Sequence, residues 1–146
     1  MGYSNKGHDG YLGDSVIGEW CNMGAGTSNS NVKNTGGKVK LWSYAENAFV
    51  SGGNKCGVMM GDYSRTAINS AINTGSVISV CCNVFSEGLT PKFIKDFSWG
   101  TTGKYEFSNA LNDITNWKKM KNKTLSETES SVLTHIFEFF NDNQTR

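Results

Sequence analysis

Apolar and small residues recur along the middle of the chain with a period of six. From position 60 onwards, every sixth residue is apolar or β-branched, and two positions before each lies a small or β-branched residue. The first column is Met60, Thr66, Ile72, Ile78 and Val84, and the second is Val58, Ser64, Ser70, Ser76 and Cys82. An amphipathic helix repeats every ~3.6 residues and a half-buried strand every ~2, so neither explains this period.

The opening stretch carries the same columns. Ile17-Gly18 and Met23-Gly24 follow Ser15 and Cys21 at the same spacing, and Leu12-Gly13 is one residue out of step. Two such blocks predict a mainly β fold, a hexapeptide-repeat parallel β-helix, in which short strands form the flats of a prism and turns form its corners. The Met60 column is then expected to line the interior. Glycine is expected at corners whose backbone conformation penalises a Cβ.

Between the two blocks the six-residue count fails. Ser28 to Gly37 has turn chemistry, and we expect an inserted loop near residues 28–38. Val39 to Trp42 is expected as a strand, and Ala45 to Lys55 as a further coil. After Val84 the repeat stops, and an irregular stretch over residues 89–103 is expected to fold back against the coils.

Two helices are predicted at the C-terminal end. Ser108 is expected to cap the first, which ends in a lysine cluster over residues 118–123 that we interpret as a solvated helix end. Ser126 and Glu129 have the spacing of a capping box that opens the second. Its apolar stripe is Val132, Leu133, Ile136, Phe137 and Phe140, and the first helix has Leu111, Ile114 and Trp117 on one face. We expect a β-helix over residues 1–103 and a helical extension over residues 104–146 that covers the last coil or a neighbouring subunit.

Composition narrows the function classes. A net charge of +1 over 146 residues gives no reason to expect nucleic acid or a membrane as a partner. No apolar run approaches the ~20 residues that cross a bilayer, and the start lacks the hydrophobic region of a signal peptide, so we expect a cytoplasmic protein. The four cysteines show neither a zinc-type pair nor a disulfide spacing, which predicts buried free thiols and no metal site.

Polar residues of the opening stretch indicate a candidate ligand site. His8 lies at the edge of the predicted prism, on a segment expected to face outward, although a lone histidine is more often structural. Tyr11 and Asn22 add a hydroxyl and an amide within about one coil, and Asn29 and Asn31 add amides on the loop. Such groups suit the recognition of a hydroxyl-rich ligand.

The same stretch resembles a known family. His8-Asp-Gly-Tyr-Leu-Gly-Asp-Ser-Val-Ile-Gly18, followed by Asn22-Met-Gly-Ala-Gly-Thr27, is similar to the acetyltransferase domain of the bifunctional N-acetylglucosamine-1-phosphate uridyltransferase/glucosamine-1-phosphate N-acetyltransferase family. The close resemblance covers residues 7–31, and a looser hexapeptide match continues to residue 86. The two terminal helices look like those of a bacterial variant described as a sugar nucleotidyltransferase.

The resemblance implies a left-handed β-helix, a hand that the right-handed crossover rule does not predict. It also implies a homotrimer with active sites between subunits, and acetyl transfer from acetyl-CoA to an amino-sugar phosphate such as glucosamine-1-phosphate, in the synthesis of UDP-N-acetylglucosamine. Within the resemblance, His8 is the general base, Tyr11 and Asn22 contact the sugar phosphate, and Asn31 contributes from the loop. Ala25 and, on a looser alignment, Ala67 line the acetyl-CoA site.

The chain departs from the family in two respects. In the family, the uridyltransferase domain, the basic residues that grip the sugar phosphate and the partner of the histidine all lie upstream of the motif. We therefore expect a C-terminal fragment that lacks the uridyltransferase domain and, by itself, has little or no acetyltransferase activity. Val32 also replaces the aromatic residue that follows the asparagine in the family, which leaves the acceptor sugar open.

Three other functions are compatible with a β-helix of this kind. A γ-class carbonic anhydrase shares the architecture but needs three histidines around zinc, and the chain has only His8 and His135, the latter on a predicted helix. A hexapeptide acyltransferase with a different amine or hydroxyl acceptor stays open. So does a non-catalytic β-helix that serves a nucleotidyltransferase as a trimerisation or ligand-binding module.

Overall fold

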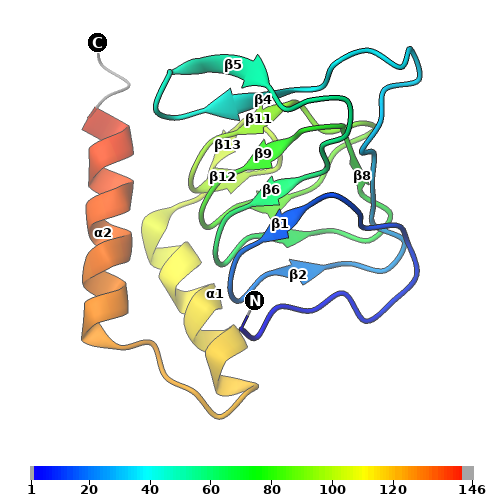
Figure 1. Cartoon of the computed structure of the whole chain (residues 1–146). Helices are drawn as coiled ribbons and strands as arrows, with labels where there is room; N and C mark the ends of the chain where they lie inside the picture. Colours follow the sequence, from blue (N-terminus) through cyan, green and yellow to red (C-terminus); the bar gives the residue numbers. More distant parts are fainter. Residues whose placement is uncertain (1, 143–146) are drawn as a thin grey trace. The chain divides into compact units, whose positions relative to one another are not determined.

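The chain folds as two units, residues 1–104 and residues 105–146, which we call the coil unit and the helical unit. Our description rests on a computed structural model that describes the backbone of residues 2–142 and the side chains of residues 2–139. The coil unit is mainly β, and the helical unit holds two α-helices (Figure 1). None of the helices in residues 2–142 has the length and apolar character needed to cross a membrane.

Three sheets of short parallel strands make up the coil unit, and the chain visits them in turn (Figure 1). The first sheet contains β1 (Val16–Ile17), β6 (Met59–Met60), β9 (Val77–Ile78) and β11 (Phe93–Ile94) in that order. The second contains β2 (Asn22–Met23), β7 (Arg65–Thr66), β10 (Asn83–Val84) and β12 (Ser98–Trp99), and ends in the antiparallel β13 (Gly103–Lys104). The third pairs β3 (Ser28–Asn29) with β8 (Ala71–Ile72).

The strand register explains the six-residue count. Met60 pairs with Ile78, eighteen residues further along, and Thr66 pairs with Val84 at the same separation. Eighteen residues are three groups of six, so each strand is followed by one strand on each of the other two sheets before the chain returns. The parallel sheets are compatible with the β-helix that the sequence predicts.

The predicted interior column is confirmed. Met60, Thr66, Ile72, Ile78 and Val84 are at most 5% exposed. The small residues two positions earlier are buried as well, and Val58 and Cys82 share one hydrophobic cluster with members of the first column. Burial of these side chains is the main favourable contribution to the stability of the coil unit.

The glycines that follow the apolar column serve close packing between coils. A left-handed φ recurs every six residues at the corners, at Asp14, Trp20 and Gly26 and again at Tyr63, Asn69, Gly75 and Cys81. Gly26 and Gly75 are therefore corner glycines as expected, whereas other residue types adopt this conformation at the remaining corners. A Cβ on Gly24 would lie 2.6 Å from the backbone carbon of Ala67 and 2.6 Å from the backbone nitrogen of Ile68. Only a residue without a Cβ allows this approach.

An excursion over residues 32–55 separates the first coil from the second. It begins later than the loop expected near residues 28–38, because Ser28 and Asn29 still form β3. The Cys56 backbone nitrogen donates to the Asn31 oxygen at 2.9 Å and closes the excursion. The strand expected at Val39 to Trp42 is present as β4 (Lys40–Ser43). The further coil expected over Ala45 to Lys55 is wrong, because β5 (Ala48–Ser51) returns antiparallel to β4 as a hairpin.

Aromatic packing and two polar contacts hold this hairpin. Trp42 stacks on Phe93 of β11 with ring centroids 4.7 Å apart, and Tyr44 meets the same ring edge-on. The Tyr44 hydroxyl hydrogen-bonds with the Ser79 hydroxyl and donates to Asp96 Oδ2 at 3.1 Å. Burial raises the pKa of the Asp96 carboxyl above its usual value. Loss of solvent around this carboxyl therefore outweighs the hydrogen bonds that favour its charged form.

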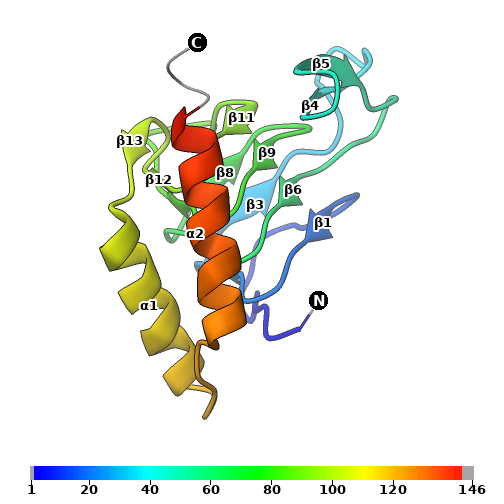
Figure 2. The same cartoon turned by 90° about the vertical axis from the view of Figure 1, so that its left-hand side faces the viewer.

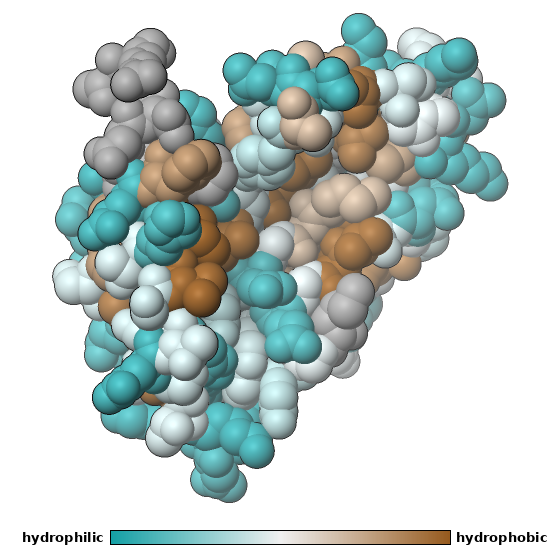
Figure 3. All heavy atoms as spheres, turned by 60° about the vertical axis from the view of Figure 1, so that its left-hand side comes forward, coloured by the Kyte–Doolittle hydropathy of each residue, from teal (hydrophilic) through white to brown (hydrophobic). Residues whose placement is uncertain are grey.

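The stretch expected to be irregular after Val84 forms another coil. β11 and β12 continue the first two sheets in parallel, but Val77 pairs with Phe93 after sixteen residues instead of eighteen. The missing two residues break the six-residue count and hide the coil from the sequence pattern. Apolar side chains also reach the molecular surface (Figure 3). The exposed apolar residues of the coil unit include Val16, Phe49 and Ile68.

Two antiparallel helices, α1 (Phe107–Lys119) and α2 (Glu127–Asp142), form the helical unit and lie side by side (Figures 1 and 2). Phe107 at the start of α1 stacks on Phe137 in α2 with ring centroids 4.7 Å apart. Ser108 does not cap α1, because the helix already begins at Phe107 and its N-cap is Glu106, which makes no side-chain cap bond. In the stripe predicted for α2, Leu133 is buried and Val132 is exposed. Phe140 lies outside the described side chains.

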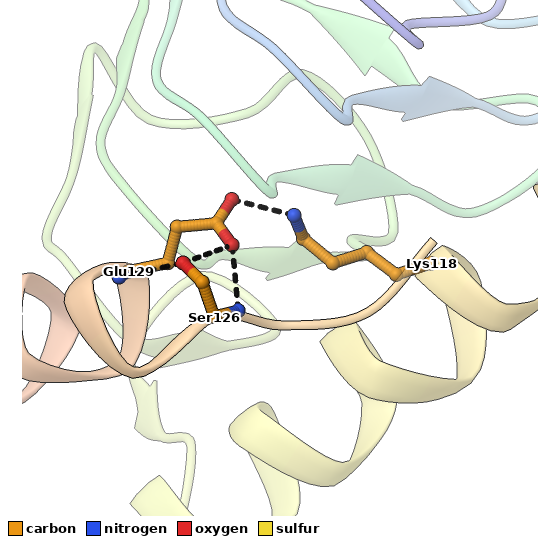
Figure 4. A network of polar contacts seen from close by, with 3 residues as sticks. All are labelled: Lys118, Ser126 and Glu129. Atoms are coloured by element: carbon orange, nitrogen blue, oxygen red, sulfur yellow. Dashed lines mark hydrogen bonds and ion pairs between the residues drawn. The ribbon is translucent and has the colours of Figure 1, made fainter. Parts of the chain in front are cut away.

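The predicted capping box of α2 is confirmed (Figure 4). The Ser126 hydroxyl accepts from the Glu129 backbone nitrogen, and Glu129 Oε2 accepts from the Ser126 backbone nitrogen. Lys118 reaches the other oxygen of Glu129 at 2.5 Å and is only 4% exposed. The solvated-end interpretation is thus wrong for Lys118, whose charge is paired, whereas Lys119, Lys121 and Lys123 are exposed.

Gly24→Ala tests the close approach between coils. We expect the free energy of unfolding to fall by about 2 kcal/mol, because the added methyl group meets backbone atoms that cannot rotate away. The matched control is Gly37→Ala, whose Cβ would meet only the Thr35 hydroxyl at 3.5 Å, and which should leave the stability nearly unchanged. Urea unfolding of the three proteins measures the difference. Equal stability of the two variants would contradict the close-packing role.

Asp96→Asn tests the buried carboxyl. Because the folded-state pKa is raised, Asp96 contributes stability that is complete below pH 3.8 and is lost as the pH rises through the raised value. The asparagine side chain of the variant cannot ionise, but it keeps an oxygen that accepts from the Val80 backbone N–H. The free energy of unfolding of the variant, relative to that of the unmodified chain, should therefore rise with pH across that window. Urea unfolding at a series of pH values measures this, with the exposed Glu46→Gln as the control. A difference that stays constant with pH would rule out the assignment.

Candidate functional site

Residues 2–13 form an irregular turn that runs alongside the first coil. Asn5 and Met23 are joined by a backbone hydrogen bond of 3.0 Å, and the Asn29 backbone nitrogen donates to the Tyr11 oxygen at 2.9 Å. Asn5 lies beside Asn22 as a parallel bridge. This register places residues 7–10 beside residues 24–27, at the corner between the second and third sheets.

His8 lies exposed at this corner, as the sequence predicts. The bridge between Asn5 and Asn22 and the close approach of Gly10 to the Thr27 oxygen place its segment alongside residues 22–27. The Ala25 oxygen accepts from the backbone nitrogen of Asn69 at 2.7 Å on the next coil. The Ala67 oxygen accepts from the Thr27 hydroxyl at 3.1 Å at the same corner. Of the predicted site residues, Ala25 and Ala67 therefore occupy successive turns of one corner, and His8 lies on the first turn, which runs beside it.

The loop that carries His8 is held by a lysine that the sequence reasoning did not single out. Lys6 Nζ donates to the backbone oxygens of Asp9 and Gly10 at 2.8 and 2.7 Å, and to that of His8 at 3.4 Å. Three carbonyl groups around one ammonium order the loop. A single lysine two residues before a histidine carries no pattern that would reveal this role.

Tyr11 and Asn31, both predicted as substrate-binding residues, are brought together by the fold. Asn31 Nδ2 donates to the Tyr11 hydroxyl oxygen at 2.9 Å and to Asp14 Oδ2 at 2.6 Å. Tyr11 is 54% exposed and Asp14 is exposed, so the cluster faces solvent. Asp14 completes the cluster although nothing in the sequence pattern identified it as a site residue.

Gly13 allows the ring of Tyr11 to reach this position. A Cβ on Gly13 would lie 1.9 Å from the Tyr11 hydroxyl oxygen and 2.4 Å from the ring carbon that carries it. The tyrosine ring therefore lies directly over the glycine. The Leu12-Gly13 pair, one residue out of step with the repeat, therefore makes room for the Tyr11 ring.

Asn29 has a structural role and not the ligand-binding role suggested for its amide. Its side chain is buried at 4% exposure. Its Oδ1 accepts from the Gly13 backbone nitrogen at 2.9 Å, and its Nδ2 donates to the Gly13 oxygen at 3.0 Å. The six-residue count from Ile17 and Met23 reaches Asn29, so the sequence does indicate an inward position.

Asn22 lies on β2, in the second sheet, and accepts from Asn5 Nδ2 through its Oδ1 at 3.2 Å. No hydrogen bond among the described residues joins it to Tyr11 or Asn31. The predicted residues thus form two groups, one at the His8 corner and one around Tyr11, with Asn22 on the sheet that leads into that corner.

The cysteines are poor nucleophiles in this fold. All four are free and buried, as the sequence predicts. Burial raises the pKa of the Cys82 thiol to about 12 and that of Cys21 above its usual value, so neither ionises near neutrality. In the part of the chain that the structure describes, no three His, Cys, Asp or Glu side chains gather as a metal site.

Comparison with known proteins gives one distant relative. No family model matches the chain. It is 35% identical over 88 residues to the bifunctional protein GlmU of Methanocaldococcus jannaschii, a match that covers 60% of this chain. The chain spans only 21% of the length of that relative. The similarity supports a GlmU-like family.

Gly13→Ala tests how Tyr11 is positioned. The added methyl group must displace the tyrosine ring, and we expect the hydrogen bond between Tyr11 and Asn31 to be lost while the fold is kept, because the displaced group is the end of a side chain. The free energy of unfolding should fall by about 1 kcal/mol or less. The side-chain amide signals of Asn31 in NMR spectra should shift, whereas Gly37→Ala should leave them in place. Unchanged Asn31 signals in Gly13→Ala would contradict the packing described.

Proposed function

We propose that this chain is an acetyltransferase domain folded as a left-handed parallel β-helix. It transfers the acetyl group of acetyl-CoA to the amine of an amino-sugar phosphate of the glucosamine-1-phosphate kind, as part of a larger sugar nucleotidyltransferase in UDP-N-acetylglucosamine synthesis. The observation that carries the proposal is the corner that holds Ala25 and Ala67, beside which the first turn carries an exposed His8. The resemblance assigns the base to His8 and the acetyl-CoA site to the two alanines.

The residues at this corner fit the proposed co-substrate. Ala25 and Ala67 carry the smallest side chains other than glycine, so they leave space at the corner for a ligand. The neighbouring Ile68 is 69% exposed and adds apolar surface to it. Acetyl-CoA supplies the acetyl group as a thioester. The free cysteines are not needed as acyl carriers, because buried thiols of raised pKa react slowly.

His8 acts as the general base. An imidazole titrates near neutrality, so it can take a proton from the ammonium group of the acceptor and free the nitrogen lone pair. The nitrogen then forms a bond to the thioester carbonyl carbon as the carbon–sulfur bond breaks, and His8 returns its proton to the sulfur that leaves. The nitrogen releases its surplus proton to solvent as the amide forms. Lys6 supports this role by fixing the backbone of the loop that carries the histidine.

Tyr11, Asn31 and Asn22 bind the acceptor in this proposal. Tyr11 is exposed and is joined to the half-buried Asn31, which suits a shared contact with one ligand. The proposal also includes a homotrimer, with each site completed by a neighbouring subunit. Sedimentation or light scattering measures that state, and a monomer at all concentrations would remove this part of the proposal.

His8→Ala tests the catalytic assignment in the longer protein that carries the N-terminal region. Acetylation of glucosamine-1-phosphate, measured as release of free coenzyme A, should fall by about 10²–10⁴-fold. The control is His135→Ala, the only other histidine, which lies exposed on α2 and should keep full activity. Unchanged turnover in His8→Ala would favour a non-catalytic scaffold. Activity toward another amine or hydroxyl, with none toward glucosamine-1-phosphate, would favour a different acceptor.

A further inference from the structure

We propose that Asp14 is a positioning residue that holds the Asn31 amide with its carbonyl oxygen outward, so that the cluster of Tyr11, Asp14 and Asn31 selects a hydroxyl group of the acceptor sugar and not its phosphate. The proposal rests on the proposed function for the identity of the ligand as a sugar. It adds a role for Asp14 and an orientation of the Asn31 amide, neither of which the resemblance assigns.

The contact with Asp14 fixes which way the amide points. A carboxylate accepts hydrogen bonds and does not donate them, so the amide atom 2.6 Å from Asp14 Oδ2 must be the nitrogen. The two hydrogens of Asn31 Nδ2 then serve Asp14 and the Tyr11 hydroxyl oxygen. Without the carboxylate, a flip of the Asn31 amide that exchanges its oxygen and nitrogen would change the free energy little, because the Tyr11 hydroxyl can either accept or donate a hydrogen bond.

This arrangement leaves two polar groups free for a ligand. The Tyr11 oxygen accepts from Asn31, so its hydrogen is available to be donated, and Asn31 Oδ1 accepts no hydrogen bond from the described residues. A sugar hydroxyl, which both donates and accepts, matches this pair of groups. A phosphate can use the donor but not the outward carbonyl oxygen, and the adjacent Asp14 carboxylate repels it.

The backbone beneath the cluster is held from several sides before any ligand arrives. Tyr11 is bonded to Ser28 and Asn29, and Gly13 to the amide of Asn29. The backbone oxygens of Asp14 and Asn31 accept from Gly57 and Cys56, where the chain returns from the excursion. Binding a ligand here therefore orders few further groups, which favours affinity.

The test is a double-mutant cycle for sugar binding by the 146-residue chain. Glucose is the probe, because it offers hydroxyls without a charge, and the side-chain amide of Asn31 and the ring of Tyr11 are followed by NMR. Asp14→Asn keeps a residue type that tolerates the left-handed φ of +49° at this position, so the backbone should be preserved. We expect it to weaken glucose binding about tenfold, because the amide orientation is no longer enforced.

The second arm separates positioning from direct contact. Asn31→Ala should weaken glucose binding, and adding Asp14→Asn to it should cause no further loss, since Asp14 acts through Asn31. Inorganic phosphate, titrated in parallel, should bind no more weakly to Asp14→Asn than to the unmodified chain. The exposed Glu46→Gln removes one negative charge elsewhere on the coil unit and should change neither titration.

Three results would overturn the proposal. The first is an equal loss of glucose affinity from Asp14→Asn whether or not Asn31 is present. The second is weaker phosphate binding when Asp14 is neutralised. The third is the absence of any change in the Asn31 signals of the unmodified chain at millimolar glucose. Failure of the acetylation assay would count against the proposed function, not against this cycle. If His8→Ala abolishes acetylation but the cycle shows no coupling, only the role of Asp14 is wrong.

Discussion

The stacking of successive coils at a fixed separation is the constraint on which the rest of the structure depends. Parallel two-residue strands are too short to be stable alone, and each gains its hydrogen-bond partners only when the chain returns to the same sheet, as β6 and β7 do with β9 and β10 after eighteen residues. The same return places apolar residues of successive coils in one interior. Gly24 shows how close the coils come, since a single added carbon would meet the backbone of the next coil. The pairing of the strands, the burial of the core and the close approach at the corners therefore all depend on the same return of the chain.

That constraint also determines where function can be placed. Side chains inside the coils are used for packing, as with Met60 and Ile78, so chemistry must come from corners, from the irregular first turn, from the excursion or from outward strand positions such as Asn22. His8 is at a corner, Tyr11 is on the first turn, and Asn31 lies where the excursion begins. Each is set on backbone that the stacked coils already hold, which gives exposed side chains a fixed position.

The sequence predicted the parts of the fold that depend on burial. The interior column could be identified because every member must be apolar or small, and the capping box of α2 because Ser126 and Glu129 interact locally. The hairpin of β4 and β5 could not, because its position depends on Trp42 stacking against Phe93, a residue far along the chain. The coil through β11 was missed since two residues fewer destroy the count. At the site, His8 and Tyr11 belong to a motif, whereas Lys6 and Asp14 gain their roles only through contacts in space.

Asn29 and Asn31 are the same residue type, but the side chain of Asn29 points into the coils and has a structural role, whereas that of Asn31 belongs to the proposed site. Asn29 stands in the column that holds Ile17 and Met23, where an amide is unfavourable unless both of its ends are satisfied. Gly13 satisfies both with its backbone nitrogen and oxygen, so the buried amide joins the first turn to the first coil. Two residues later, the half-buried amide of Asn31 meets the exposed Tyr11 and is oriented by the Asp14 carboxylate. Because Gly13 both receives the inner amide and leaves room for the ring of Tyr11, the residue that secures the turn also shapes the site above it.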